Sequence, residues 1–307
     1  MSTQRILVTG GAGFVGRLLL SRLTGSGNNV LAPPGPGRTG GVDLADATSC
    51  KEMVEAFRPT VIVHLAARSS VVGGETDPDG VWRDNFDATR NLASAAHRLG
   101  HPVHFVFASS AEVYGVAFNA GACAEDSAVM PVSSYGRTKA AAEMILRDMA
   151  SSRLRVTVLR LFNHTGPGQD ERFVIPSFAA QIARAERSKD SASIEVGNLE
   201  AQRDFTDVED ILDAYVLVVQ GPEPKASYVV FNVGSGRTRR IGDVLNRLLQ
   251  NAKCTISVRT AADRMRPSDI PIAAGNFAKF QSAYGWRPQR DLDDTLAAIL
   301  DARRAAL

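Results

Sequence analysis

Short apolar segments alternate with longer helical patterns through the first two thirds of the chain, and this alternation restricts the possible folds more than any other feature. The apolar segments lie at residues 6–9, 29–32, 61–65, 103–107 and 155–162. The helical patterns lie at residues 14–23, 48–57, 79–99 and 133–150. Because strands such as Val61-Ile62-Val63 are apolar on both faces, they are typical of a parallel sheet covered by helices on both sides. The predicted fold is therefore α/β, with a doubly wound parallel sheet.

The pattern is less regular after residue 162. The sequence predicts a loop at 163–170, a helix at 174–185, a short strand at 194–196, a clear helix at 207–220 and a strong strand at 229–233. We expect the last helix and strand to return to the sheet. The predicted domains are thus residues 1–165 together with 207–233, and a smaller C-terminal lobe formed by residues 166–206 and 234–307.

The charge balance and the cysteines limit the class of protein and its compartment. Lysine and arginine number 35 against 33 aspartates and glutamates, and the formal net charge of +2 excludes a strongly basic nucleic-acid-binding protein. The three cysteines, at positions 50, 123 and 254, form neither a disulfide framework nor a metal-binding pair, which favours a reducing compartment. The chain shows no transmembrane segment and no signal-peptide pattern. We therefore expect a soluble cytoplasmic protein that binds neither nucleic acid nor membranes.

Three histidines have a spacing that resembles a metal site. They are His97, His101 and His104. Gly100 and Pro102 interrupt any helix between them, so the three side chains do not share one helical face. No metal site is predicted.

A glycine-rich loop follows the first strand and precedes the first helix. Gly10, Gly13 and Gly16 have the spacing G-x-x-G-x-x-G. Glycine permits the tight turn and lets backbone N–H groups approach a diphosphate, and the helix N-terminus adds partial positive charge there. At the first strand–helix junction of a parallel sheet, this loop predicts a Rossmann-type dinucleotide site.

The residues after the second strand bear on the choice of dinucleotide. An NAD site expects an acidic residue about 20 positions beyond the glycine loop, for the ribose hydroxyls. The first acidic residue of the whole chain is Asp43, and the loop before it carries Arg38. Since a 2′-phosphate requires positive charge, this pattern slightly favours NADP over NAD. Both cofactors remain open, as does the interpretation of Arg38 as a solvated loop residue.

A serine, a tyrosine and a lysine follow in an order that indicates proton transfer. Ser110 ends the fourth strand, where ligands of such sheets usually bind. Tyr135 and Lys139 are four residues apart and share one helix face. An ammonium beside a phenol favours the phenolate, so we expect Lys139 to lower the pKa of Tyr135 from about 10. Tyr135 would exchange a proton with a sugar or alcohol oxygen that Ser110 holds.

Together these features resemble the extended short-chain dehydrogenase/reductases of the NAD-dependent epimerase/dehydratase family. The resemblance covers nearly the whole chain and rests on residues 9–16, 42–44, 64–67, 85, 109–115, 135 and 139. It implies that Ser110, Tyr135 and Lys139 are catalytic. With Arg38, the implied cofactor-binding residues are Gly10, Gly13, Phe14, Val15, Gly16, Asp43, Leu44, Leu65, Ala66, Ala67, Tyr135, Lys139 and Leu161.

Segments of the second half resemble enzymes that act on GDP-sugars. Residues 160–169, 173–177, 196–208 and 264–271 are similar to GDP-mannose 4,6-dehydratases and more closely to GDP-4-keto-6-deoxy-mannose reductases. The resemblance implies a C-terminal substrate lobe, and substrate contacts at Ser110, Asn163, Val174, Arg203 and Arg266. Arginine forks suit the oxygens of a diphosphate.

The triplet Ser110-Ala111-Glu112 separates the possible reactions. Dehydratases of this superfamily use a carboxylate in the middle or last position, and Ala111 transfers no proton, although Glu112 remains a candidate catalytic base. We therefore predict NAD(P)H-dependent reduction of the C4 keto group of a GDP-4-keto-6-deoxy-hexose. The alternatives are a GDP-mannose 4,6-dehydratase, a nucleotide-sugar 4-epimerase and a dinucleotide-sensing regulatory protein. The resemblance also implies a homodimer that pairs through the helices predicted at 79–99 and 133–150.

Overall fold

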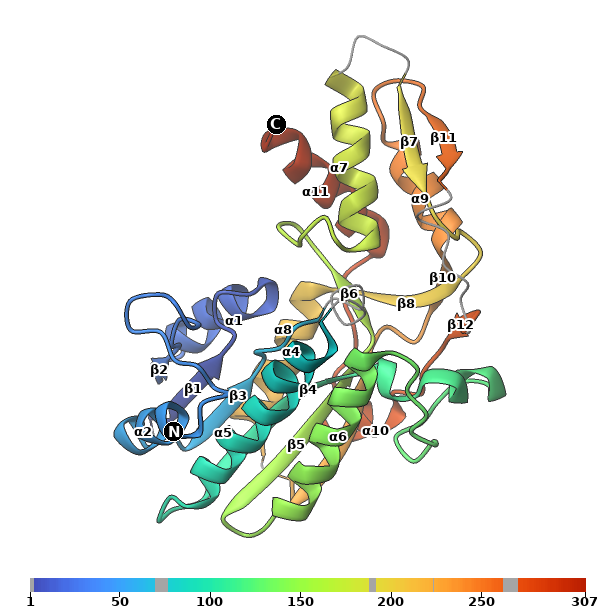
Figure 1. Ribbon diagram of the computed structural model, residues 1–307. Coiled ribbons are helices and arrows are strands. Elements are labelled where there is room, and N and C mark those ends of the chain that lie inside the picture. Colours follow the sequence, from blue (N-terminus) through green and yellow to red (C-terminus); the bar gives the residue numbers. More distant parts are fainter. Residues whose placement is uncertain (1–2, 70–76, 188–191, 223, 262–269) are drawn as a thin grey trace.

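The computed structural model describes residues 3–69, 77–187, 192–222, 224–261 and 270–307. Its main sheet has six strands in the order β2-β1-β3-β4-β5-β9, and every neighbouring pair is parallel (Figure 1). The strands are β1 (Arg5–Thr9), β2 (Asn29–Leu31), β3 (Val61–His64), β4 (Val103–Ser110), β5 (Leu154–Leu161) and β9 (Tyr228–Val233). This confirms the predicted parallel α/β fold. The chain turns back across the sheet between β2 and β3, so the carboxyl ends of β1 and β3 flank a switch point where ligands bind in such folds.

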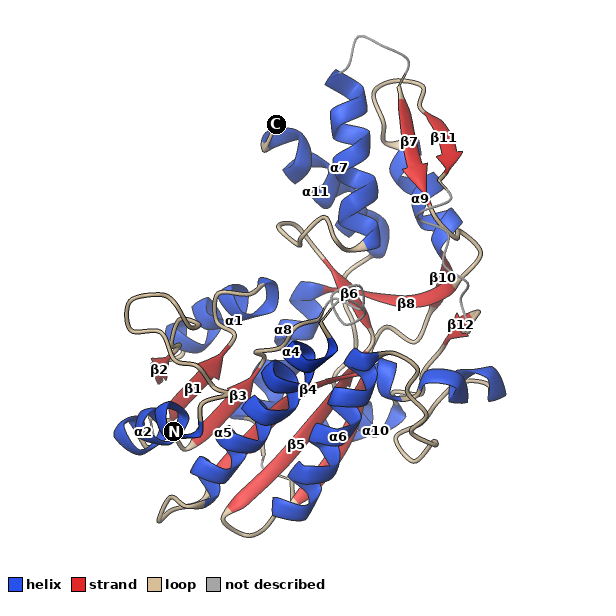
Figure 2. Ribbon diagram, in the orientation of Figure 1, coloured by secondary structure: helices blue, strands red, loops and turns tan. Residues whose placement is uncertain are grey.

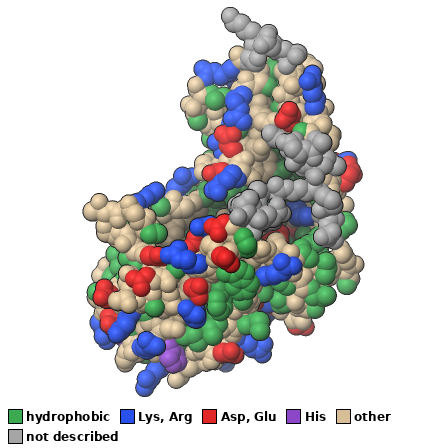
Figure 3. All heavy atoms as spheres, in the orientation of Figure 1, with side chains coloured by type: hydrophobic (Ala, Val, Ile, Leu, Met, Phe, Trp, Pro, Cys, Tyr) green, Lys and Arg blue, Asp and Glu red, His purple; other side chains and the backbone are tan. Residues whose placement is uncertain are grey.

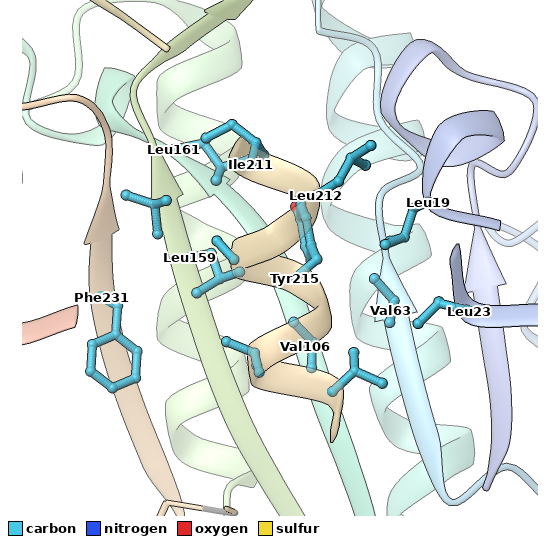
Figure 4. Close-up of a cluster of buried hydrophobic side chains, with 14 of the residues drawn as sticks. Leu19, Leu23, Val63, Val106, Leu159, Leu161, Ile211, Leu212, Tyr215 and Phe231 are labelled. Atoms are coloured by element: carbon cyan, nitrogen blue, oxygen red, sulfur yellow. The ribbon is translucent and has the colours of Figure 1, made fainter. Parts of the chain in front are cut away.

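Successive residues of the strands point to opposite faces and fill two separate cores. Ile6 and Val8 pack beneath α1 (Phe14–Gly25), α8 (Val208–Gln220) and α10 (Ala278–Tyr284). Figure 4 shows the centre of this core, with Tyr215 of α8 among apolar side chains from several strands. Leu7 packs on the other face beneath α2 (Ala47–Phe57), α5 (Ala88–His97) and α6 (Ser134–Met149). Both faces of the sheet are thus covered, as the apolar strands require.

The helix predicted at 79–99 is interrupted. It consists of α4 (Pro78–Trp82), a π-helical turn η1 (Arg83–Asp87) and α5. Asn85 lies inside that turn and is buried, and its side chain accepts a hydrogen bond from the backbone N–H of Arg68 at 2.8 Å and donates to Thr138 Oγ1 at 3.0 Å. These two bonds draw the helix toward the end of β3 and toward α6, which accounts for the extra residue in the turn.

A second group of elements covers the carboxyl edge of the sheet (Figure 2). It comprises β6 (Asn163–Thr165), α7 (Val174–Arg187), β7 (Ser193–Val196), β8 (Gln202–Asp207), β10 (Thr238–Arg240), α9 (Ile241–Gln250), β11 (Ser257–Thr260), β12 (Ile272–Ala273) and α11 (Leu292–Ala305). Helices α7, α9 and α11 share a core of their own. The loop predicted at 163–170 is wrong at its start, because residues 163–165 pair with β8.

Two elements show how the chain moves between these parts. Strand β9 pairs with β5 at the edge of the main sheet. Helix α8 packs beside α1 on one face of that sheet. Helix α10 lies within the range 234–307, yet its Phe280 is fully buried against β9 in the core of the main sheet. Within the described ranges, no helix combines the length and the apolar character needed to cross a membrane.

Candidate active site

The glycine loop forms a cradle that admits no side chains. Gly10 has a positive φ of 73°, and a Cβ there would lie 2.7 Å from the backbone nitrogen of Ala66. A Cβ on Gly16 would lie 2.2 Å from the carbonyl oxygen of Gly10, and the N–H of Gly13 donates to that same oxygen at 2.9 Å. Gly13 is the N-cap of α1 and supplies no side-chain cap. The first N–H groups of α1 therefore suit an anion such as a diphosphate, and the cradle fits a dinucleotide.

The side chain of Phe14, at the start of α1, faces β6 of the second group of elements. Phe14 stacks with His164 of β6, with ring centroids 6.5 Å apart and planes 4° from parallel. Val15 packs on the core beneath α1. Leu161 ends β5 and is the register partner of Ser110. The structure thus brings these predicted cofactor residues to the carboxyl edge of the main sheet.

The other predicted cofactor residues lie along the ends of β2 and β3. Leu65, Ala66 and Ala67 are half-buried directly after β3, and the N–H of Ala66 donates to Thr9 Oγ1 at 3.4 Å. The carboxylate of Asp43 pairs with Arg83 and accepts from the N–H of residue 45.

The remaining two residues of this group lie near Asp43 in the sequence. The carbonyl of Leu44 accepts from Asn91 of α5 at 3.1 Å. Arg38 is exposed in the loop after β2. The preference for NADP that Arg38 suggested stays a prediction.

Ser110, Tyr135 and Lys139 meet where β4 ends beside α6. The side chains of Ser110 and Tyr135 are hydrogen-bonded to each other. Lys139 is buried, and its Nζ donates to the carbonyl oxygen of Ala108 at 2.7 Å. The same Nζ lies 4.7 Å from the centroid of the Phe107 ring and 5.8 Å from that of Tyr135. The spacing in the sequence therefore predicted a cluster that the fold assembles.

The electrostatics of the phenol differ from the expectation. Burial raises the pKa of Tyr135 to about 12, the hydrogen bond from Ser110 opposes this increase, and the nearby Glu112 carboxylate adds to it. The prediction that Lys139 lowers this pKa is wrong for this structure, because the ammonium is bonded to Ala108 rather than to the phenol. Tyr135 is consequently protonated at neutral pH, which is the state that a proton donor requires.

Lys139 and His64 have the opposite shifts. Burial lowers the pKa of Lys139 to about 7, although the Glu143 carboxylate raises it. Burial, with a contribution from the Lys139 charge, lowers the pKa of His64 to about 3. His64 is fully buried between Thr9 Oγ1 at 2.6 Å and Thr89 Oγ1 at 2.9 Å. A neutral imidazole therefore joins the end of β1, directly before the glycine loop, to α5.

Three of the predicted substrate residues lie on the lobe side. Asn163 is exposed on β6, and Val174 begins α7. On β8, Arg203 donates through Nη1 to the carbonyl oxygens of Gln202 at 2.8 Å and Ile270 at 3.1 Å.

Glu112 lies near Arg203 and Tyr135. Burial lowers the pKa of Arg203, while the charge of Glu112 raises it. Glu112 also adds to the raised pKa of Tyr135, so it lies at the junction of the two groups. Arg266, the other predicted substrate arginine, lies outside the described residues.

Several polar groups beneath the cluster were not predicted as site residues. Glu143 and Arg160 form an ion pair of 2.7 Å with only 6% of each side chain exposed. Arg160 and His64 are single polar residues within apolar strands, which gives no sequence signal, whereas the four-residue spacing of Glu143 from Lys139 was a signal that could have found it. Asn85 was among the residues that resemble the family, but its contacts could not be predicted from the sequence. In the part of the chain that the structure describes, no three metal-ligating side chains come together.

Comparisons with known proteins agree with this geometry. A model of the NAD dependent epimerase/dehydratase family matches residues 6–234. GDP-6-deoxy-D-mannose reductase of Pseudomonas aeruginosa is 34% identical over 300 residues, which span 97% of this chain and 96% of that protein. The solved structure of RMD from Pseudomonas aeruginosa complexed with NADPH has a TM-score of 0.87 and 33% identity, over 99% of this chain and 100% of that one. UDP-glucose 4-epimerase of Rhizobium leguminosarum bv. trifolii is 28% identical over 98% of both chains.

Proposed function

The chain belongs to the NAD dependent epimerase/dehydratase family, and from this premise we propose that it reduces the C4 keto group of a GDP-4-keto-6-deoxy-hexose with NADPH or NADH. The observation that carries the proposal is the cluster of Ser110, Tyr135 and Lys139 beside the glycine cradle, with a protonated phenol. A relative that is 34% identical over almost the whole chain is a GDP-6-deoxy-D-mannose reductase, which supports the choice of substrate.

The proposed reaction assigns one role to each residue of the cluster. When bound, the nicotinamide supplies a hydride for C4 of the sugar. Ser110 donates a hydrogen bond to the carbonyl oxygen and holds it beside Tyr135. Tyr135 gives its proton to that oxygen as negative charge develops there, so the alcohol forms without release of an alkoxide. Lys139 binds the nicotinamide ribose and is part of the proton path to Tyr135.

We propose a division of binding between the two parts of the chain. Residues 1–165 with 207–233 hold the dinucleotide, and residues 166–206 with 234–307 hold the nucleotide-sugar. Arg203 and Arg266 bind the diphosphate and ribose, Asn163 contacts the sugar diphosphate, and Val174 packs against the base. Arg203 on β8 supports this division, because its side chain lies close enough to Glu112 for their charges to interact.

Two other reactions remain as second candidates. Glu112 interacts electrostatically with Tyr135, which is where a dehydratase would need a base. The 28% identity with a UDP-glucose 4-epimerase supports epimerisation with tightly bound NAD. The intact cluster argues against a regulatory protein that only senses dinucleotides.

An assay with two sugars separates these candidates. Purified protein is mixed with NADPH, or separately NADH, and with either GDP-4-keto-6-deoxy-mannose or GDP-mannose. A reductase oxidises the cofactor only with the keto sugar, and the ratio of the two rates identifies the preferred dinucleotide. Conversion of GDP-mannose without added reductant would instead establish the dehydratase, and interconversion of nucleotide-sugar epimers would establish the epimerase.

We further propose a cytoplasmic homodimer. Cys50 and Cys123 are buried free thiols and Cys254 is an exposed one, which suits a reducing compartment. Figure 3 shows hydrophobic side chains gathered on the face that α4, α5 and α6 present. On these helices, 38% of Trp82 and 70% of Met144 are exposed. Two copies would cover this apolar surface by pairing these helices into a bundle.

A further inference from the structure

Helix α6 carries a third polar side chain on the face that holds Tyr135 and Lys139. Glu143 lies one turn beyond Lys139 and is 4% exposed. Arg160 of β5 donates from Nε to both carboxylate oxygens at 3.0 and 3.2 Å, and from Nη2 to Oε2 at 2.7 Å. Ser109 Oγ donates to Oε1. Because both oxygens have donors on fixed strands, the orientation of Glu143 is determined by the sheet.

The ion pair continues into a row of polar contacts across the sheet. Ser109, Arg160 and Asn232 are register partners on β4, β5 and β9. Arg160 Nη1 donates to the hydroxyl of Tyr114 and to the carbonyl oxygen of Glu125, both at 3.0 Å. Tyr114 in turn donates to Asn232 Oδ1 at 2.7 Å. Tyr114 and the backbone of Glu125 therefore hold the Arg160 guanidinium in place while it neutralises the Glu143 carboxylate.

Three consecutive residues at the end of β4 each hold one residue of α6. The pairs are Ala108 with Lys139, Ser109 with Glu143, and Ser110 with Tyr135. Along β4, the pair Ser109–Glu143 lies between the two pairs that form the candidate active site. Any shift of α6 along β4 would thus break the bonds of Glu143 together with those of the reacting groups.

A buried ion pair is an inefficient way to stabilise a fold, since apolar residues of the same volume often serve as well. Glu143 lies one helical turn from Lys139 and its charge acts on the ammonium, which gives the pair another use. We propose that Glu143, held by Arg160, is a positioning residue that fixes the Lys139 ammonium in the candidate active site and favours its charged state. This inference rests on the proposed reductase function, in which Lys139 acts as a cation.

The charges around Lys139 determine what loss of the carboxylate would do. Tyr135 and Glu143 face it from α6, His64 from β3, and Arg160 lies behind Glu143 on β5. His64 and Tyr135 are neutral at pH 7, so Glu143 is the negative charge that favours the ammonium. Burial lowers the pKa of Lys139, and the Glu143 carboxylate partly offsets this to give a pKa of about 7. Without that carboxylate the pKa would be lower. Removing the Glu143 charge therefore makes Lys139 lose its proton at lower pH.

The test compares E143Q, which removes the charge and keeps the shape, with E143D, which keeps the charge. We measure kcat/KM against pH with NADPH and GDP-4-keto-6-deoxy-mannose. In the native protein we expect kcat/KM to fall as the pH rises through the pKa of Lys139. We expect this limb to move by about one unit to lower pH in E143Q and to stay in place in E143D. An E143Q limb that coincides with that of the native protein would overturn the proposal.

Two further measurements keep the result interpretable. The double variant E143M/R160M removes both charges at similar volume, and once circular dichroism shows it to be folded, it should show the same shift as E143Q. A folded double variant with the native pH profile would assign the pair to the fold alone and overturn the proposal. The proposal would also be overturned if E143Q and the double variant failed to fold while E143D folded. NADPH binding, followed by its fluorescence across the same pH range, should weaken several-fold through the same shifted transition. If the native protein binds NADPH but does not reduce the keto sugar, the proposed function fails, and the binding curves alone decide the role of Glu143.

Discussion

At the residue level, the proposed chemistry depends on the hydroxyl of Tyr135. Burial keeps its pKa at about 12, so the phenol holds its proton at neutral pH. A reduction needs a proton donor at the new alcohol, whereas an oxidation needs a phenolate to accept one. The positions of Ser110, Tyr135 and Lys139 were predictable from their spacing. The direction of the pKa shift was not, because it depends on which atom Lys139 contacts.

Loss of the Tyr135 hydroxyl tests this assignment. Tyr135→Phe should lower kcat by about 10²- to 10⁴-fold, since the phenol is the proposed proton donor. NADPH affinity and Tm should stay close to those of the native protein. Tyr284→Phe is the matched control, because its buried hydroxyl has no hydrogen-bond partner among the described residues and its loss should leave kcat unchanged. Turnover by folded Tyr135→Phe at the native rate would exclude this tyrosine as the donor.

His64 makes the fold sensitive to acid. Its pKa is lowered from 6.5 to about 3 in the folded chain, so between these values only the unfolded chain takes up a proton at this residue. The contribution of His64 to stability is therefore complete above pH 6.5 and decreases as the pH falls. From pH 7 to pH 5 the linkage amounts to about 2 kcal/mol.

The measurement is urea unfolding of the native protein and of His64→Gln at both pH values. The variant should be less stable at pH 7, because it loses the hydrogen bonds of His64 to Thr9 and Thr89. Because glutamine stays neutral, the variant should lose about 2 kcal/mol less than the native protein on going to pH 5. Equal losses in the two proteins would show that His64 does not carry this acid sensitivity.

At the scale of elements, strand and helix positions followed from the sequence, and their interruptions did not. Strands β1, β3, β4 and β5 lie close to their predicted bounds, with β4 extended to Ser110. The π-helical turn at Asn85 was missed because its cause is a pair of hydrogen bonds to Arg68 and Thr138, which lie 17 and 53 residues away. The three-residue strand β6 was missed for a similar reason, since it exists only through pairing with β8.

The junction of β1 and α1 allows a prediction with an internal control. Gly16→Ala places a Cβ 2.2 Å from the carbonyl oxygen of Gly10, whereas a Cβ added to Gly25 in the same helix would have no heavy atom within 4 Å. We expect Gly16→Ala to lower stability by about 1–3 kcal/mol and to weaken NADPH binding at least tenfold. Gly25→Ala should retain both properties. Calorimetry and fluorescence titration measure them, and normal NADPH binding by Gly16→Ala would contradict the proposed cradle.

At the scale of the whole molecule, the main sheet supplies the cluster of reacting groups and the lobe supplies the arginine on β8. The parallel sheet was predictable because its strands are short, apolar and separated by helices. The lobe was less predictable, since its strands pair across long stretches of sequence, as β11 does with β7. The burial of α10 against β9 shows that late residues also complete the first core.

The apolar face on α4 and α6 predicts an assembly. Light scattering should give twice the chain mass of 32.8 kDa for the native protein. Met144→Asp places a charge on the exposed apolar face of α6 and should give the mass of a single chain. Val258→Asp is the control, because Val258 is 41% exposed on β11, away from that face, and the variant should keep the native mass. A native protein of single-chain mass would contradict the dimer.

If this cluster reduces the C4 carbonyl of a nucleotide-sugar, the hydrogen added at C4 comes from the nicotinamide, and isotope transfer detects it. The protein is supplied with NADPH carrying deuterium at the transferable C4 position, together with GDP-4-keto-6-deoxy-mannose, and the product is analysed by proton NMR. We expect one deuterium at C4 of the sugar and loss of the corresponding proton signal, with Tyr135→Phe giving little product. A product without deuterium at C4, or no product from a protein that binds both molecules, would contradict the proposed reduction.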